Sequence, residues 1–285
     1  MSGAVQIIDE RVCHLGEGPL WHPERGQLFW FDINAKQLLT REASGPLMWQ
    51  FDEHVSAAGW LDHDTLLIAS ETALFRFDIA TGTSEHVIDL EADNPVTRSN
   101  DGRADPWGGF WIGTMGKQAE DCAGAIYRFY QGKLEPLYHD ITISNAICFS
   151  PDRNFAYYAD TPTRQIMRQT LDSEGWPTGP ATVFVDLNAE GLNPDGAVVD
   201  SEGYLWNAQW GAHRVTRYAP EGRVDSTVNL AASQPSCPAF GGQDLTNLYV
   251  TSATESLSEA NDADGRVLSL PVAVVGQAEH RVKLV

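Results

Sequence analysis

The sequence predicts an all-β protein, a β-propeller of six blades with four antiparallel strands each. Short apolar and aromatic runs bounded by Gly, Pro, Asp and Asn recur along all 285 residues. The runs repeat about every 40 to 50 residues, which is the length of one four-stranded blade. Helical periodicity is scarce, so we expect few helices. The six runs begin near Gln27, Thr65, Gly109, Asn154, Gly203 and Asn247.

Most of the aromatic runs are followed by a second strand-like stretch that usually ends in a glycine-containing turn, as a hairpin requires. These second stretches include "ALFRFDIATG", "GAIYRFYQGK", "QIMRQTLDSEG", "HRVTRYAPEG" and "GRVLSLPV". A β-sandwich or a pair of jelly rolls would also contain many short strands, but it would not explain six evenly spaced copies.

The two ends of the chain, "VQIIDERVC" and "GQAEHRVKLV", are extended in character. They could therefore close the ring by pairing with each other within one blade. Because no stretch has the composition of a linker, we expect residues 1–285 to form a single propeller domain.

Acidic residues outnumber basic ones by 39 to 19, which gives a formal charge of -20. This charge disfavours nucleic acid and anionic membranes as partners and is compatible with a cation or a small neutral molecule. Its main explanation is a well-solvated surface, so the charge alone assigns no function. The four cysteines are far apart and contain no CxxC pair, so neither a zinc knuckle nor a disulfide framework is indicated. Without a signal-peptide pattern or a membrane-spanning run, we expect a cytoplasmic protein. We also expect a monomer.

Polar residues recur ahead of four of the aromatic strands. Counting back about eight or nine residues from the turn before each strand leads to a carboxylate or an amide in every case. Equivalent positions on successive blades face the same central channel, so we expect the four side chains to converge. They are Glu17, Asn100, Asn145 and Asp195.

Two carboxylates and two amides form an oxygen-rich set that suits Ca²⁺, Mg²⁺ or Mn²⁺, with Zn²⁺ and Fe²⁺ left open. Carboxylates gathered without a cation would repel each other and lose solvation. Asn-Asp-Gly and Asn-Pro-Asp-Gly are also common turn sequences. A turn could therefore explain any one of these sites, but it explains less well why four of them occupy the same place in the repeat. The corresponding residues of the other two repeats, Val55 or Ser56 and Cys237 or Pro238, are expected to form walls. Motifs for phosphate-binding loops, zinc proteases and serine hydrolases are missing from the sequence.

Five segments, in this order and spacing, resemble the senescence marker protein, regucalcin and gluconolactonase family of six-bladed propeller lactonases. The segments are "LGEGPLW", "RSNDGRADPWGGFWIGTM", "ISNAICFSPD", "NPDGAVVDSEGYLWNAQWG" and "CPAFGGQDLTNLYVTSA", and together they cover essentially the whole chain. The resemblance implies a sugar lactone lactonase, a carboxylic ester hydrolase that opens an aldonolactone to the free sugar acid.

The resemblance also assigns residues to roles. It implies that Glu17, Asn145 and Asp195 hold one divalent metal ion, and that Arg98 and Asn100 contact the lactone. In some members of the family a further glutamate binds substrate, and the segment "EDCAGAIY" supplies Glu120 at that position.

Lactone hydrolysis needs an activated water and a stabilised oxyanion, and a divalent ion supplies both. Asp195 is then the candidate to take a proton from the water, while Arg98 offers a planar fork of donors to substrate oxygens. Asp101 could orient Arg98 or assist proton transfer, although Asp-Gly pairs are also common in turns. Two other functions remain open: a phosphotriesterase of the diisopropylfluorophosphatase type, and a propeller that binds calcium or a protein without catalysis.

Overall fold

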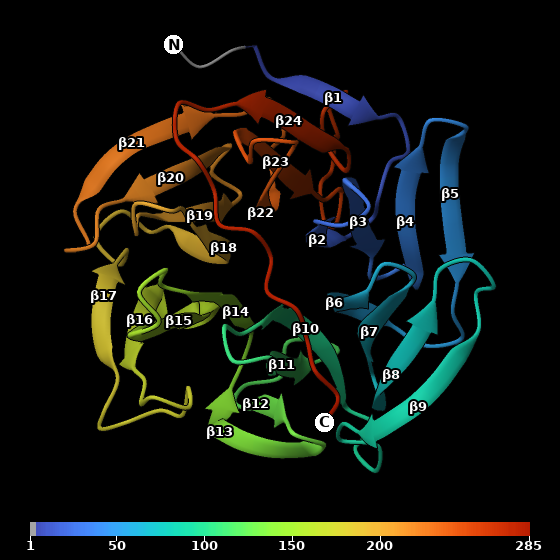
Figure 1. Ribbon diagram of the computed structural model, residues 1–285. Helices are drawn as coiled ribbons and strands as arrows, with labels where there is room; N and C mark the ends of the chain where they lie inside the picture. Colours follow the sequence, from blue (N-terminus) through green and yellow to red (C-terminus); the bar gives the residue numbers. More distant parts are fainter. Residues whose placement is uncertain (1–3) are drawn as a thin grey trace.

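The computed structural model describes residues 4–285 as six four-stranded antiparallel sheets arranged in a ring around a central channel (Figure 1). The predicted six-bladed β-propeller is therefore confirmed. Within residues 4–285 the one helical element is a three-residue 3-10 turn, η1 (Thr161–Thr163). No helix in this range is long and apolar enough to cross a membrane.

Each of the first five blades is a meander whose first strand lies at the channel and whose fourth lies at the rim. Blade 1 contains β2 (Gly16–His22), β3 (Gln27–Asp32), β4 (Gln37–Glu42) and β5 (Gly45–Gln50). Blade 2 contains β6 (Val55–Asp62), β7 (Thr65–Ser70), β8 (Ala73–Asp78) and β9 (Ser84–Asp89). Blade 3 contains β10 (Thr97–Ala104), β11 (Phe110–Gly116), β12 (Gly124–Tyr130) and β13 (Lys133–Ile141).

The second half of the ring repeats the pattern. Blade 4 contains β14 (Ser144–Phe149), β15 (Phe155–Asp160), β16 (Gln165–Thr170) and β17 (Thr182–Asp186). Blade 5 contains β18 (Asn193–Val199), β19 (Leu205–Trp210), β20 (Arg214–Tyr218) and β21 (Val224–Asn229). Blade 6 contains β22 (Pro235–Gly241), β23 (Asn247–Ser252) and β24 (Val267–Pro271), and its fourth strand is β1 (Gln6–Asp9) from the other end of the chain.

The ring is closed by β1, which pairs antiparallel with β24 so that Gln6 lies opposite Ser269. The expectation that the two extended ends pair with each other is wrong for the C-terminal one. Residues 276–285 instead cross the channel as an irregular segment, here called the strap, drawn in red in Figure 1. The strap cannot continue one sheet because its backbone amides bond to different blades: Val282 donates to Trp60, and Lys283 donates to Gly108.

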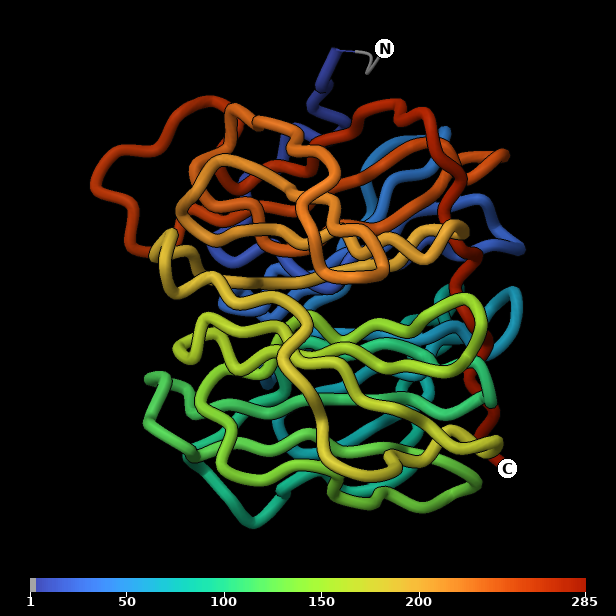
Figure 2. The backbone as a smooth tube through the Cα atoms, turned by 90° about the vertical axis from the view of Figure 1, so that its left-hand side faces the viewer, coloured from blue at the N-terminus to red at the C-terminus, as the bar shows by residue number. Residues whose placement is uncertain are grey.

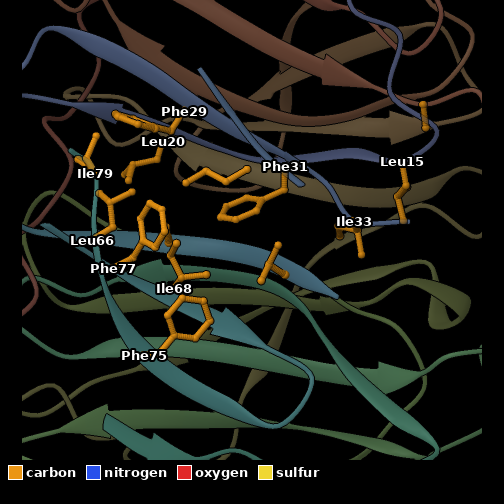
Figure 3. Packing of buried hydrophobic residues seen from close by; sticks show 14 residues of the cluster. Leu15, Leu20, Phe29, Phe31, Ile33, Leu66, Ile68, Phe75, Phe77 and Ile79 are labelled. Atoms are coloured by element: carbon orange, nitrogen blue, oxygen red, sulfur yellow. The ribbon is translucent and has the colours of Figure 1, made fainter. Parts of the chain in front are cut away.

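Apolar side chains fill the spaces between neighbouring blades. Between blades 1 and 2, Phe29 and Phe31 of β3 pack with Ile68 of β7 and with Phe75 and Phe77 of β8 (Figure 3). Each large side chain buried in this way contributes roughly 1.5–3 kcal/mol. Comparable clusters lie between the other blades, and together they fix the inner strands that line the channel.

The inner strands run from one mouth of the channel to the other. The strap covers their C-terminal ends, where Gln277 donates hydrogen bonds to the carbonyls of Phe149 in β14 and Val199 in β18. Their N-terminal ends lie at the opposite mouth. In Figure 2 the strap runs along one face of the molecule, and the loop that follows β23, residues 253–266, projects from the opposite face.

Candidate active site

A cavity of about 430 Å³ opens at the mouth opposite the strap. Its walls come from the first residues of the inner strands and from the loops beside them. Glu17, Arg98, Asn100, Asn145 and Asp195 all line it, so the structure brings five of the seven predicted site residues together. Each of these five is only 3% to 7% exposed.

A β-bulge near the start of the inner strands aims these side chains into the cavity. In β2 the residues Gly18 and Pro19 lie opposite a single residue of β3, and in β18 the residues Asp195 and Gly196 lie opposite one residue of β19. The same irregularity recurs in β10 and β14. The four polar residues are therefore not strictly equivalent: Glu17 and Asn145 directly precede their bulges, whereas Asn100 and Asp195 lie within theirs.

The backbone of blade 2 passes so close to the residue after Glu17 that only glycine fits there, at position 18. Its φ is +53°, and a Cβ at this position would lie 2.2 Å from the carbonyl oxygen of Ser56. Its amide donates to the Glu17 carboxylate at 2.8 Å. Glycine alone meets both requirements, since it takes positive φ without steric cost.

Asn145 is held so that its carbonyl oxygen is available to the cavity. Its Nδ2 donates to Oγ1 of Thr161 at 2.9 Å, and that hydroxyl donates to the carbonyl of Pro194 at 2.8 Å. The Oδ1 of Asn145 lies 3.5 Å from Nδ2 of Asn100. An amide oriented by its own N–H groups presents its oxygen as a ligand.

The two carboxylates lack a protein cation. Among the ion pairs of residues 4–285, each with an N–O distance of 4.0 Å or less, neither Glu17 nor Asp195 takes part. Burial and the Asp101 carboxylate raise the pKa of Glu17 to about 8. Burial and the charge of Glu17 raise the pKa of Asp195 well above its ordinary value. Two buried carboxylates that disfavour each other's ionised form create a place where a bound cation would be stabilising.

Arg98 is a buried guanidinium without a carboxylate partner. Its Nη1 donates to the carbonyl of Ser99 and to Oδ1 of Asn100, both at 2.8 Å. Burial lowers its pKa to about 10, so the group stays charged at neutral pH. Asn100 is fixed from its other side, because its Nδ2 donates to the carbonyl of Ser144 at 2.8 Å. Arg98 and Asn100 therefore form a rigid polar pair in the cavity wall.

The remaining two predicted residues do not line the cavity. Asp101 lies beneath it, fully buried, where its Oδ2 accepts a hydrogen bond from the Ile147 amide at 2.7 Å. Burial raises the pKa of Asp101 to about 6. Glu120 is exposed, and its Oε2 accepts a hydrogen bond from the Gln118 amide at 2.9 Å within the same loop. Gln118 and Lys117 line the cavity where Glu120 was expected.

Several cavity residues were not anticipated from the sequence. The wall also contains Asn34, His54, Thr161, Trp210 and Glu255, which come from loops or strand ends at this mouth. His54 directly precedes the first residue of β6, so extending the repeat comparison by one residue could have found it. No pattern in the sequence marks Glu255, because it lies in the long loop after β23.

The cavity suits a single divalent cation by the chemistry of its donors. No three His, Cys, Asp or Glu side chains in residues 4–285 gather closely enough to hold a metal by themselves. The candidate set reaches three protein donors because an amide oxygen joins two carboxylates, and such all-oxygen sets bind hard cations. Glu17, Asn145 and Asp195 thus have the donor chemistry that a divalent cation would need.

The fold and the cavity together define a class of protein: a six-bladed β-propeller with an oxygen-lined ligand site at one mouth of its channel. Residues 15–254 match the model of the SMP-30/gluconolactonase/LRE-like region. The chain therefore belongs to this family.

Curated relatives extend the similarity over nearly the whole chain. An L-arabinolactonase of Azospirillum brasilense is 37% identical over 92% of this chain and 89% of its own length. A 6-deoxy-6-sulfogluconolactonase of Pseudomonas putida is 34% identical over 98% of both chains. The solved structure of a calcium-binding protein, regucalcin, from Agrobacterium tumefaciens is 40% identical and superposes with a TM-score of 0.96, covering 99% of this chain and 98% of the other.

Proposed function

We propose that this protein is a metal-dependent sugar lactone lactonase, which hydrolyses an aldonolactone to the free sugar acid. One observation carries the proposal: a single cavity holds two buried carboxylates and a buried arginine, and none of the three forms an ion pair with another side chain of residues 4–285. Such an arrangement is costly unless ligands of both kinds occupy it. A cation bound by the carboxylates and an oxygen-rich substrate bound by the arginine satisfy both requirements.

Glu17, Asn145 and Asp195 would hold the cation. When bound, a divalent ion at such a site polarises the lactone carbonyl and lowers the pKa of a coordinated water. Ca²⁺, Mg²⁺, Mn²⁺, Zn²⁺ and Fe²⁺ are all candidates, because oxygen donors discriminate weakly among them.

The chain's own side chains orient the substrate and move the proton. Arg98 donates through its unoccupied nitrogens to lactone oxygens, and Asn100 fixes the guanidinium plane. Asp195 takes a proton from the attacking water and returns it to the ring oxygen when the ester C–O bond breaks. Trp210 offers an aromatic face to the sugar, while Asp101 influences the site through its charge from below. Glu120 supports the loop that carries Gln118 rather than contacting the substrate.

The substrate class follows from the polar character of the cavity and from the relatives. The two curated relatives described above are named for different lactones, one derived from a pentose and one from a sulfonated hexose. We therefore propose an aldonolactone with several free hydroxyl groups, such as glucono-, xylono-, arabinono- or galactonolactone.

The test is an assay of metal-stripped protein reconstituted with single divalent cations across a panel of aldonolactones, following acid release. We expect turnover only with a cation, and a loss of at least about 10³-fold in Asp195→Ala with an unchanged fold. Asp93→Ala, at an exposed surface position, is the matched control.

Two results would contradict the proposal. Hydrolysis of an organophosphate ester far above every lactone would make the protein a phosphotriesterase. Tight cation binding with no turnover of any ester would make it a non-catalytic binding propeller.

A further inference from the structure

His54 forms a dyad with a carboxylate at the edge of the cavity. It lies directly before β6 on blade 2 and lines the cavity, with 22% of its side chain exposed. Its Nδ1 is hydrogen-bonded to Oε1 of Glu71, and its backbone amide donates to the same oxygen at 3.1 Å. The other oxygen of Glu71 pairs with Nζ of Lys117 at 2.6 Å. Glu71 is therefore held on two sides, and the imidazole orientation is fixed.

This arrangement sets the tautomer of the imidazole. A carboxylate acceptor at Nδ1 keeps the proton on that nitrogen, so Nε2 carries the lone pair. Within residues 4–285, Nε2 has no hydrogen-bond partner. The dyad therefore presents an unoccupied proton acceptor at a cavity that also opens to solvent.

The charges around His54 favour its neutral form at rest. Burial lowers its pKa, the bond to Glu71 opposes this effect, and the positive charges of Arg98 and Lys36 lower it further. Burial opposes ionisation of Glu71 as well, but its bonds from Lys117 and His54 hold its pKa at about 2. At neutral pH the pair is thus an imidazole beside a carboxylate, ready to accept one proton.

The dyad lies across the channel from the proposed base. His54 belongs to blade 2 and Asp195 to blade 5, and Figure 1 shows β6 and β18 on opposite sides of the ring centre. A lactone bound between them would have a buried carboxylate on one side and a solvent-connected imidazole on the other. Asp195 is 5% exposed, so it has little direct access to bulk water.

Lactone hydrolysis releases one proton for each turnover. Water adds to the carbonyl, the ring C–O bond breaks, the ring oxygen keeps one proton of the water, and the new carboxyl group loses the other. We propose that His54, positioned by Glu71, is the relay that accepts this proton on Nε2 and passes it to bulk water at the cavity mouth. This inference rests on the proposed lactonase activity.

The experiment compares the parent protein with His54→Gln and Glu71→Gln, each loaded with the same cation, in buffers of increasing concentration. In His54→Gln we expect kcat to fall on the order of a hundredfold at low buffer concentration, within the range for a positioned proton-transfer group. Imidazole added to the solution should restore most of this loss, because it replaces the missing relay. Glu71→Gln should lower kcat less and shift its pH profile, since the imidazole remains but is no longer oriented.

His86→Gln is the matched control. Like His54, His86 pairs with a carboxylate, that of Asp89 at 2.7 Å, but it lies on the exposed outer strand β9 of the same blade. The kcat of the His86→Gln variant should equal that of the parent protein at every buffer concentration.

The outcomes separate this inference from the proposed function. If the parent protein hydrolyses no lactone with any cation, the proposed function fails. If the parent is active and His54→Gln only raises KM, or loses kcat without rescue by imidazole, then His54 binds or shapes the site and the relay is disproved. Circular dichroism and thermal unfolding of each variant verify that a lost rate does not reflect a lost fold.

Discussion

In the part of the chain that the structure describes, buried charged side chains are paired with each other at one end of the central channel and are unpaired at the other end. Towards the strap, Arg103 is paired with Glu279, and both are less than a tenth exposed. At the cavity, Arg98 is equally buried, yet within residues 4–285 neither Arg98 nor the carboxylates of Glu17 and Asp195 form an ion pair. The charged side chains are buried to a similar extent at both ends. The two ends differ in the partners of these charges, which are protein side chains at the strap end only.

The strap end is complete without a ligand. Arg103 also donates to the carbonyls of Ile147 and Ala197, each at 3.3 Å, and the carbonyl of Glu279 accepts a bond from Trp60 Nε1 at 2.9 Å. Each side chain of this set therefore has a protein partner, as expected of a structural closure. The cavity end lacks such partners, which indicates that its charges are retained for ligands.

The largest expected effect comes from breaking the pair at the strap end. Arg103→Met leaves Glu279 buried and alone, which should lower the free energy of unfolding by about 3–5 kcal/mol. Urea denaturation measures the loss. Arg103→Met/Glu279→Met should recover a large part of it, whereas Arg223→Met, which breaks a fully exposed pair with Glu221, should leave the free energy of unfolding almost unchanged. A loss below 1 kcal/mol in Arg103→Met would show that the two ends do not differ as described.

Binding of a divalent cation at the cavity end is expected to change the free energy of unfolding by a smaller amount. A divalent cation at a hundredfold excess over its Kd should raise the free energy of unfolding by about 2.7 kcal/mol. Asp195→Asn should abolish this gain while leaving the stability of the metal-free protein equal or higher, because one of two repelling carboxylates is gone. Thermal denaturation with and without the cation measures both. If metal-free Asp195→Asn were much less stable than the metal-free parent protein, Asp195 would be needed to stabilise the fold.

The backbone that carries Glu17 can be tested through Gly18. Gly18→Ala places a Cβ against Ser56 at a positive φ, and we expect a loss of about 1–3 kcal/mol together with weaker cation binding. Gly211→Ala is a control with positive φ but no atom within 4 Å of the added Cβ. Calorimetric titration should show weaker binding only in Gly18→Ala, and equal affinity in both variants would contradict the assigned role of the bulge.

The smallest effect concerns the rim dyad. The folded-state pKa of Glu71 is about 2, below its ordinary value near 4.5, so its pairing stabilises the protein above pH 4.5 and is lost as the pH falls towards 2. Glu71→Gln should therefore be destabilised by less than about 1 kcal/mol at pH 7, since the pair is partly exposed, and the difference should disappear near pH 2. Urea midpoints at several pH values measure it. If the difference in stability between the parent protein and Glu71→Gln grew as the pH fell, the assigned direction of the Glu71 pKa shift would be contradicted.

The fold was predictable because each blade repeats its own hydrophobic and turn pattern locally. The strap was not, because "GQAEHRVKLV" is compatible both with a strand and with an irregular segment that bonds to several blades. Convergence of Glu17, Asn100, Asn145 and Asp195 also followed from the repeat, although the bulges offset their positions by one residue.

Loop geometry explains the residues that the sequence did not locate. In the loop between β11 and β12, Glu120 is exposed and accepts a bond from the Gln118 amide of the same loop, whereas Lys117 and Gln118 line the cavity. The contact of His54 with Glu71 depends on the register of β6 and β7, which aligns Val55 with Ser70. Neither feature has a local sequence signature.

We propose that the unpaired charges at the cavity end form a metal-dependent hydrolytic site. The most direct measurement titrates metal-stripped protein with one divalent cation while lactone turnover is followed in the same samples. We predict that turnover rises in proportion to the bound cation, saturates at one cation per chain, and is absent throughout in Asp195→Ala. Full turnover by the stripped protein, or saturation with cation without any turnover, would contradict it.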